Sequence, residues 1–242
     1  MRRRSAFTSV FCLLAAIVLY TEGLWLWADV TLRPVAPLKL SGAVSIAVRP
    51  YNTFLILSLH VRRGGDLVPG LRVTIMGQPA TEPSPGFYRC EISGFSPTPG
   101  SLVTVSIAGA PRILPIPPAG REEPLVATAT IGSLVAFTNP APEAHISRAS
   151  LRPLTISWRG GNPPYSLTIY PFTGKDEVGE AVFEQSGIAG TSVAVPMAYF
   201  RTSGKYGIYL SCMMEKFRFS RKIDPGSNFQ LRQSRGTYIY IE

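Results

Sequence analysis

The sequence predicts an all-β protein, with two β-sandwich domains in tandem behind an N-terminal signal peptide or signal anchor. Hydrophobic residues make up 45% of the 242 residues and charged residues only 16%, while 22 glycines and 22 prolines interrupt the chain every few residues. This balance is typical of many short strands joined by turns. The length suits two domains of about 100 residues each behind a short leader.

The clearest strand pattern lies between Pro153 and Tyr170. Apolar and polar residues alternate over residues 154–159 and again over residues 165–170, which is the period of half-buried strands. The five residues between them, Gly-Gly-Asn-Pro-Pro, are turn formers. We therefore expect a β-hairpin whose inward face carries Trp158 into a core.

The N-terminal segment, residues 1–28, has the features of an export signal. Three arginines precede an apolar run from Val10 to Tyr20, which has the length of a signal-peptide core rather than of a full membrane span. Cleavage after residue 23 or 28 would release a secreted protein. Alternatively, residues 6–28 stay as a membrane anchor with the arginines in the cytoplasm. Both alternatives place the rest of the chain outside the cytoplasm.

The first β-sandwich domain is predicted at residues 29–110, because short apolar runs there are separated by glycine and proline turns. The expected strands are Leu38–Val48, Thr53–Val61, Leu71–Met76, Phe87–Ile92 and Leu102–Ile107. Three segments within this domain, Leu67–Val73, Gly86–Tyr88 and Pro99–Gly100, resemble carboxypeptidase-regulatory-like and related bacterial Ig-like domains. That resemblance implies a small β-sandwich that serves as a structural or binding spacer and carries no catalytic residues.

A proline-rich linker is predicted at residues 111–124, since its prolines can continue neither a sheet nor a helix. The second domain then covers residues 125–242. Beyond the hairpin we expect strands at Ala181–Gln185, Ser192–Val195, Tyr206–Met214, Phe229–Arg232 and Thr237–Ile241.

Parts of this second domain resemble a fibronectin type III or related immunoglobulin-like domain. The segment LTISW (154–158) resembles the tryptophan-bearing strand B of that fold, and YSLTIYP (165–171) resembles strand C. Phe200 and Tyr206 resemble the strand of the tyrosine corner, although the residues before Tyr206 depart from the usual proline and glycine spacing. The resemblance implies an Ig-like sandwich in which strands C, F and G lie side by side in one sheet.

No constellation of side chains indicates catalysis. His60 and His145 lie in different predicted domains, as do Cys90 and Cys212, which we expect to be separate core residues. The acidic run from Asp176 to Glu180 lacks the spacing of a calcium loop. We therefore predict no enzyme activity, no cofactor and no metal site. The net charge of +9 favours anionic partners, but no nucleic-acid-binding motif accompanies it, so no nucleic-acid partner is expected.

Four tyrosines form the candidate binding site: Tyr170, Tyr209, Tyr238 and Tyr240. Each alternates with inward-facing apolar residues, so they are expected to point outward together from strands C, F and G. We expect Lys205, Arg218 and Arg235 to surround them. Such a surface suits a protein or a sugar. Alternatively, the first domain or a second copy of the chain covers the patch, or the tyrosines only stabilise the sheet.

The function expected from these features is a non-catalytic, extracytoplasmic binding, adhesion or assembly component of a cell envelope. The alternative is a carbohydrate-binding accessory module that uses the tyrosine face. The expected partner is accordingly a protein or glycan of the envelope, with membrane association through residues 6–28 in the anchored case.

Overall fold

The computed structural model describes residues 36–109, 123–149, 152–174 and 177–242. The predicted leader and most of the predicted linker lie outside these residues. The described part is all-β, as predicted, with a single 3-10 turn at Met197–Tyr199 and no α-helix. It contains no helix of the length and apolar character that crossing a membrane requires.

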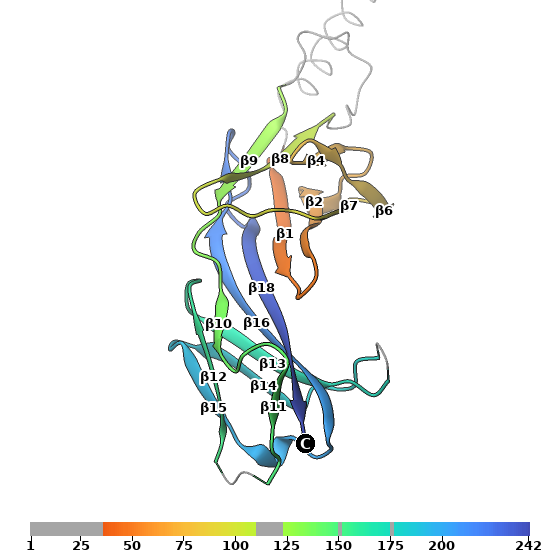
Figure 1. The fold of residues 1–242 in the computed structure, drawn as a ribbon. Coiled ribbons are helices and arrows are strands. Elements are labelled where there is room, and N and C mark those ends of the chain that lie inside the picture. The colour runs from red at the N-terminus through yellow and green to blue at the C-terminus, as the bar shows by residue number, and fades with distance from the viewer. Residues whose placement is uncertain (1–35, 110–122, 150–151, 175–176) are drawn as a thin grey trace, which may run out of the picture. The chain divides into compact units, whose positions relative to one another are not determined.

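The largest element is a ten-stranded sheet, here called the long sheet (Figure 1). Eight strands follow one another across it, and two short strands, β11 and β3, pair with β18 and β2. In spatial order the eight are β14 (Phe183–Ile188), β13 (Tyr165–Pro171), β16 (Gly204–Lys216), β18 (Asn228–Ile241), β1 (Leu38–Val48), β2 (Thr53–Arg63), β7 (Phe87–Ser93) and β6 (Thr81–Ser84). The two additional strands are β11 (Ala144–Ile146) and β3 (Asp66–Leu67).

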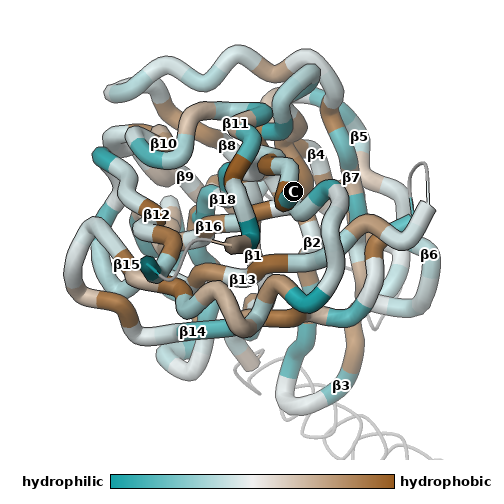
Figure 2. The backbone as a smooth tube through the Cα atoms, turned by 60° about the horizontal axis from the view of Figure 1, so that its bottom comes forward, coloured by the Kyte–Doolittle hydropathy of each residue, from teal (hydrophilic) through white to brown (hydrophobic). Residues whose placement is uncertain are grey.

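Two smaller sheets complete two sandwiches with the long sheet. The first cover sheet has the order β17 (Arg218–Phe219), β9 (Leu125–Thr130), β8 (Leu102–Ala108), β4 (Arg72–Ile75) and β5 (Gln78–Pro79). The second has the order β10 (Ala136–Asn139), β12 (Leu154–Arg159) and β15 (Ser192–Val195). Apolar and polar residues alternate along the strands (Figure 2), and the apolar ones fill two separate cores.

The core of the first sandwich is mostly aliphatic. Alternate residues of β2, from Leu55 to Val61, are fully buried in it. Tyr88 lies at its edge, where its hydroxyl donates to the Val68 carbonyl (2.9 Å) and accepts from the Leu71 N–H (3.0 Å). The core therefore holds the loop before β4 through one buried tyrosine.

The core of the second sandwich contains larger rings. Trp158 is buried, as predicted, and meets the Tyr165 ring edge to face at 5.3 Å. Phe200 packs on Tyr206 in the same way at 5.1 Å. The Tyr206 hydroxyl donates to the Thr202 carbonyl (2.9 Å), four residues earlier, which is the bond expected of a tyrosine corner.

The strand order of the second sandwich is consistent with an Ig-like sandwich. Strands β13, β16 and β18 are neighbours in one sheet, as predicted for strands C, F and G, and β10, β12 and β15 form the opposite sheet. The resemblance at LTISW and YSLTIYP also agrees with this arrangement, because strands B and C of that fold belong to different sheets.

The predicted hairpin at residues 153–170 is wrong. Strand β12 pairs with β10 and β15, whereas β13 pairs with β14 and β16, so the two strands face each other across the core. Gly160 and Gly161, both with positive φ, turn the chain from one sheet to the other. A side chain at either position would overlap Leu134 or Val135. The alternation of apolar and polar residues shows which residues face inward. It does not show which of the two sheets a strand belongs to, because strands of both sheets alternate in the same way.

The predicted strands 229–232 and 237–241 are one continuous strand. Strand β18 pairs with β16 along its length and with β1, in parallel, from Asn228 to Arg235. Phe229 and Leu231 of this strand pack in the first core, and Ile239 and Ile241 pack in the second. Strand β9, expected in the second domain, lies in the first cover sheet, and its apolar residues enter the first core. The cores thus separate between Ile131 and Val135, and residues 37–242 form one compact unit.

Gln233 connects the crossing segment at this boundary. It faces inward from β18 and is buried; its amide oxygen accepts from the Val135 N–H (3.1 Å), and its amide nitrogen donates to the Ser133 carbonyl (3.2 Å). The side chain thus satisfies backbone groups of the segment that leads from β9 to β10.

Candidate functional site

The pairing registers bring the predicted tyrosines onto one outward face of the long sheet. Tyr170 of β13 and Tyr238 of β18 both lie opposite Gly207 of β16. Tyr209 lies one row further along, between Thr168 and Gly236, and Tyr240 lies opposite Lys205. All four tyrosines are half-buried. We call the outward side chains of Tyr170, Phe172, Lys205, Tyr209, Tyr238 and Tyr240 the aromatic face.

Close ring contacts order this face. Tyr170 meets Tyr209 edge to face at 5.7 Å, and Phe172 meets Tyr238 in the same manner at 5.4 Å. The Lys205 ammonium lies 4.0 Å from the Tyr238 ring centre and 4.9 Å from that of Phe172. A lysine held over two rings is attracted by their negative faces. The rings are therefore held in place by one another before any partner arrives.

Two glycines make room for the central ring. A side chain on Gly207 would lie 2.8 Å from the Tyr209 ring, and one on Gly236 would lie 3.0 Å from it. Both glycines are buried although they face outward, because the ring covers them. Burial in turn raises the pKa of Tyr209, and the neighbouring Tyr238 adds to the effect.

The edge of the face next to β11 carries charged groups. The Tyr240 ring stacks on His145 with 4.9 Å between ring centres, and His145 contacts the Glu242 carboxylate. Tyr51, at the turn between β1 and β2, donates its hydroxyl to Glu143 (3.1 Å) and is 83% exposed. The Glu143 carboxylate raises the pKa of Tyr51, because it accepts this bond and repels the phenolate.

Of the three basic residues expected around the tyrosines, only Lys205 joins them. Arg218 lies in the first cover sheet, where it bonds to Glu215 (3.0 Å). Arg235 has the opposite strand parity from Tyr238, so it belongs to the other face of β18. The expectation for Arg218 and Arg235 is therefore wrong, because closeness in sequence to a tyrosine does not fix the side of the sheet.

Sequence reasoning missed Phe172, His145 and Tyr51. Phe172 continues the outward series of residues 166, 168 and 170, a signal that Pro171 obscured. No local pattern places Tyr51 or His145 beside the tyrosines, since both arrive there through pairing with strands distant in the sequence.

The other residues weighed for chemistry remain apart. Cys90 and Cys212 are free and belong to different cores, and burial raises the pKa of Cys90. His60 stacks on Phe87 at 4.6 Å, far along the sheet from His145. Within the described ranges, no three His, Cys, Asp or Glu side chains gather as a metal site would require.

Comparisons with known proteins add little to this geometry. No protein-family model matches the chain, and no curated protein matches it. Among solved structures, the chain is similar to a chimeric titin Z1Z2 functionalized with a KLER exogenous peptide from decorin, with 11% sequence identity over 87% of this chain and 99% of that chain. The TM-score of 0.25 is too low to show a shared fold. The strand pairing alone therefore defines the fold.

Proposed function

We propose that the protein is a non-catalytic, extracytoplasmic binding, adhesion or assembly component of a cell envelope, and that the aromatic face binds its partner. The observation that carries this proposal is the gathering of five aromatic rings and Lys205 on adjacent strands of one sheet. Aromatic residues dominate binding energy at protein interfaces, and pre-ordered rings lose little conformational freedom on binding.

A protein or other macromolecular partner is favoured over a sugar. Lys205 already occupies the faces of the Phe172 and Tyr238 rings, so those two faces are not free to stack on a pyranose. Ring edges, phenol hydroxyls and one ammonium remain for contact. These groups suit the mixed apolar and hydrogen-bonding surface of another protein.

Photo-crosslinking in the native cell tests this proposal. A photoreactive phenylalanine analogue replaces Tyr170 in one strain and Tyr199, an exposed tyrosine outside the aromatic face, in a control strain. We expect a discrete crosslinked product with one envelope molecule from position 170 only, and its loss when Tyr238→Ser is added. Equal products from both positions, or none from position 170, would contradict the proposal.

The second candidate function is carbohydrate binding through the same face. The phenol groups of Tyr170 and Tyr240, together with Lys205, favour it, since hydroxyl and ammonium groups bond readily to sugar hydroxyls. Affinity electrophoresis in gels that contain envelope polysaccharide measures it. Retardation that Tyr238→Ser or Tyr240→Ser abolishes, with unchanged melting temperature and with Tyr199→Ser as the control, would favour the sugar over the protein partner.

The proposed location has its own test. The intact mass of the protein from its native cell distinguishes the two forms of the N-terminus. A mass that lacks residues 1–23 or 1–28 would indicate a secreted protein, and a full-length mass would indicate an anchored one.

A further inference from the structure

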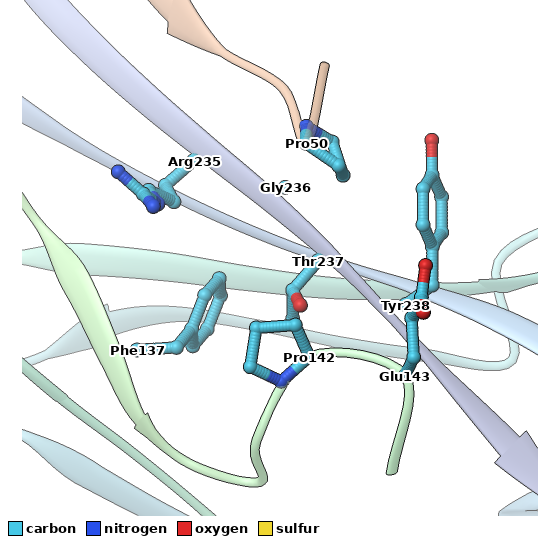
Figure 3. Close-up of a pocket in the computed structure, with 8 residues that line it drawn as sticks. All are labelled: Pro50, Phe137, Pro142, Glu143, Arg235, Gly236, Thr237 and Tyr238. Carbon is cyan, nitrogen blue, oxygen red and sulfur yellow. The ribbon is translucent and has the colours of Figure 1, made fainter.

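A small cavity lies where β18 changes its parallel partner. Strand β1 accompanies β18 as far as Arg235, and β11 begins only at Ile239. Between these points Gly236, Thr237 and Tyr238 border a cavity of about 160 Å³ (Figure 3). A cavity of about 150 Å³ holds a ligand of six heavy atoms in other proteins. This space, the notch, therefore fits a molecule of that size.

The floor of the notch contains a buried hydroxyl without a partner. Thr237 faces inward from β18 and is 4% exposed, and its Oγ1 makes no hydrogen bond with any described residue. Buried polar groups are nearly always paired, and an unpaired hydroxyl destabilises the fold. A hydroxyl left unpaired beside a cavity is the arrangement expected where a ligand or a water molecule in the cavity supplies the missing bond.

The backbone of Gly236 also directs its N–H and its carbonyl into the gap between β1 and β11. The Tyr238 carbonyl accepts from the Glu143 N–H (2.8 Å), so the backbone groups of Tyr238 point towards β11. Alternate residues of a strand direct these groups to the same side, which turns those of Gly236 in that direction too. The notch walls Pro50 and Pro142 have no N–H to offer.

The two ends of the notch carry opposite charges. Arg235 and Glu143 lie on opposite sides of the cavity (Figure 3). Within the described part of the chain, no ion pair joins either of them to a side chain of opposite charge. Glu143 accepts a single hydrogen bond from Tyr51, which leaves its carboxylate able to accept others. Phe137 and the two prolines provide the apolar walls between the charges.

We propose that the notch binds a small zwitterion of amino-acid size, with its carboxylate at Arg235, its ammonium at Glu143 and a hydrogen bond to the Thr237 hydroxyl. The aliphatic part lies against Phe137 and the prolines. Free amino acids and the ends of short peptides share this chemistry. The notch adjoins the aromatic face, because Tyr238 lines both and Glu143 lies at the edge of that face. The proposal nevertheless does not depend on the partner of the aromatic face, because the Thr237 hydroxyl and Arg235 belong to the inward side of β18.

Calorimetric titration of the full chain tests the notch with defined probes. The zwitterions are glycine, alanine and valine; propionate, propylamine and N-acetylalanine amide each lack one or both charges, and dialanine separates a peptide from a free amino acid. We expect at least one zwitterion to bind about tenfold more tightly than every compound that lacks a charge, since a hydrogen bond to a charged group contributes that much or more. Equal binding of the uncharged amide would overturn the proposal, as would no binding of any zwitterion, dialanine included, at about 10 mM.

Three substitutions locate the binding. Glu143→Gln and Arg235→Gln should each weaken the zwitterion about tenfold, whereas Glu184→Gln and Arg159→Gln, exposed on other strands, should not. Thr237→Val is the sharpest variant, because it removes the unpaired hydroxyl and keeps the volume. The free protein should melt at the same or a higher temperature, and the zwitterion should bind about fivefold more weakly. Unchanged affinity in Thr237→Val would overturn the role of the hydroxyl, and unchanged affinity in Glu143→Gln and Arg235→Gln would overturn the site.

Discussion

Each sandwich contains a buried tyrosine whose hydroxyl bonds to the backbone, but the two tyrosines act over different distances. Tyr88 in the first sandwich bonds to Val68, twenty residues earlier, and to Leu71. Tyr206 in the second bonds to Thr202, only four residues earlier. The first bond closes a long loop, and the second shapes a local turn. The first sandwich thus depends more on contacts between distant parts of the chain. It also contains strand β9 and part of strand β18, which belong to the second half of the sequence.

The largest expected effect comes from removing the main ring of the second core. Trp158→Ala should lower the free energy of unfolding by about 3–5 kcal/mol, because the lost burial leaves a cavity. Since β16 and β18 run through both sandwiches, hydrogen exchange of residues 55–61 in the first core should rise as well. Leu57→Ala is the matching substitution in the first core, and it should lower the free energy of unfolding by about 2–5 kcal/mol. Two separate unfolding transitions, each confined to one sandwich, would contradict this coupling.

Gln233→Leu tests the connection between the cores. The substitution keeps much of the volume but leaves the Val135 N–H without its partner, whereas the Ser133 carbonyl still accepts from the Gly161 N–H (3.0 Å). Each buried group left unpaired costs about 1–3 kcal/mol. We expect a lower midpoint in urea denaturation together with faster exchange at the Val135 amide. A variant as stable as the native chain would show that water replaces the glutamine.

The tyrosine comparison can be tested directly with two matched substitutions. Tyr88→Phe leaves the buried Leu71 N–H without a partner, so it should destabilise by about 1–3 kcal/mol. Tyr206→Phe removes contacts with the Thr202 N–H, hydroxyl and carbonyl. These groups lie nearer to solvent, where water can replace the lost partner, so the substitution should cost about 1 kcal/mol. Thermal unfolding measures both. A larger loss of stability for Tyr206→Phe than for Tyr88→Phe would show that the local bond contributes more than the long-range one.

The smallest expected effect concerns acid and the first sandwich. The Gly70 and Gly86 N–H groups donate to Glu82 (2.9 and 2.7 Å) and lower the pKa of its carboxyl below the usual 4.5. A lowered pKa in the folded state stabilises the fold above pH 4.5, and this contribution is lost as the pH falls through the folded value. Because water reaches the carboxylate, the effect should stay below about 1 kcal/mol.

Glu82→Gln should remove this pH dependence, as measured by urea denaturation at pH 7 and pH 3.5. Glu215 remains as an internal comparison, since the Thr130 N–H lowers its pKa in the same direction. An unchanged pH profile in Glu82→Gln would assign the acid sensitivity to other groups.

Local pattern predicted the strands well and their partners poorly. The alternation of Leu154, Ile156 and Trp158 is visible in the sequence, because burial of one face imposes it. The choice of β10 and β15 as partners of that strand, rather than β13, depends on contacts that no local window contains. The same limit explains the single strand β18: Arg235 and Gly236 have the appearance of a turn, yet the Tyr209 ring requires the glycine there.

The candidate site was predictable to the same extent. Parity along each strand placed Tyr170, Tyr209, Tyr238 and Tyr240 outward, and the predicted neighbourhood of strands C, F and G brought them together. The neighbouring side chains of Tyr51 and His145 followed only from the pairing of β1 and β11 with β18. Arg235 was misplaced because residues 229–241 were predicted as two strands, which hid the parity of Arg235 relative to Tyr238. The notch had no sequence signal at all, because it results from a gap between two strands.

The parallel pairing of β1 with β18 sets an order for biosynthesis. The Leu40 N–H bonds to the Ser227 hydroxyl, 187 residues later in the chain, and β18, the central strand beside β1, is made after the other strands that the structure describes. A ribosome or translocon delivers the N-terminal residues first, and separate domains ordinarily fold as they emerge. Here we expect the first half to emerge with one edge of β1 unpaired and part of its core uncovered, and to remain so until β18 has been made.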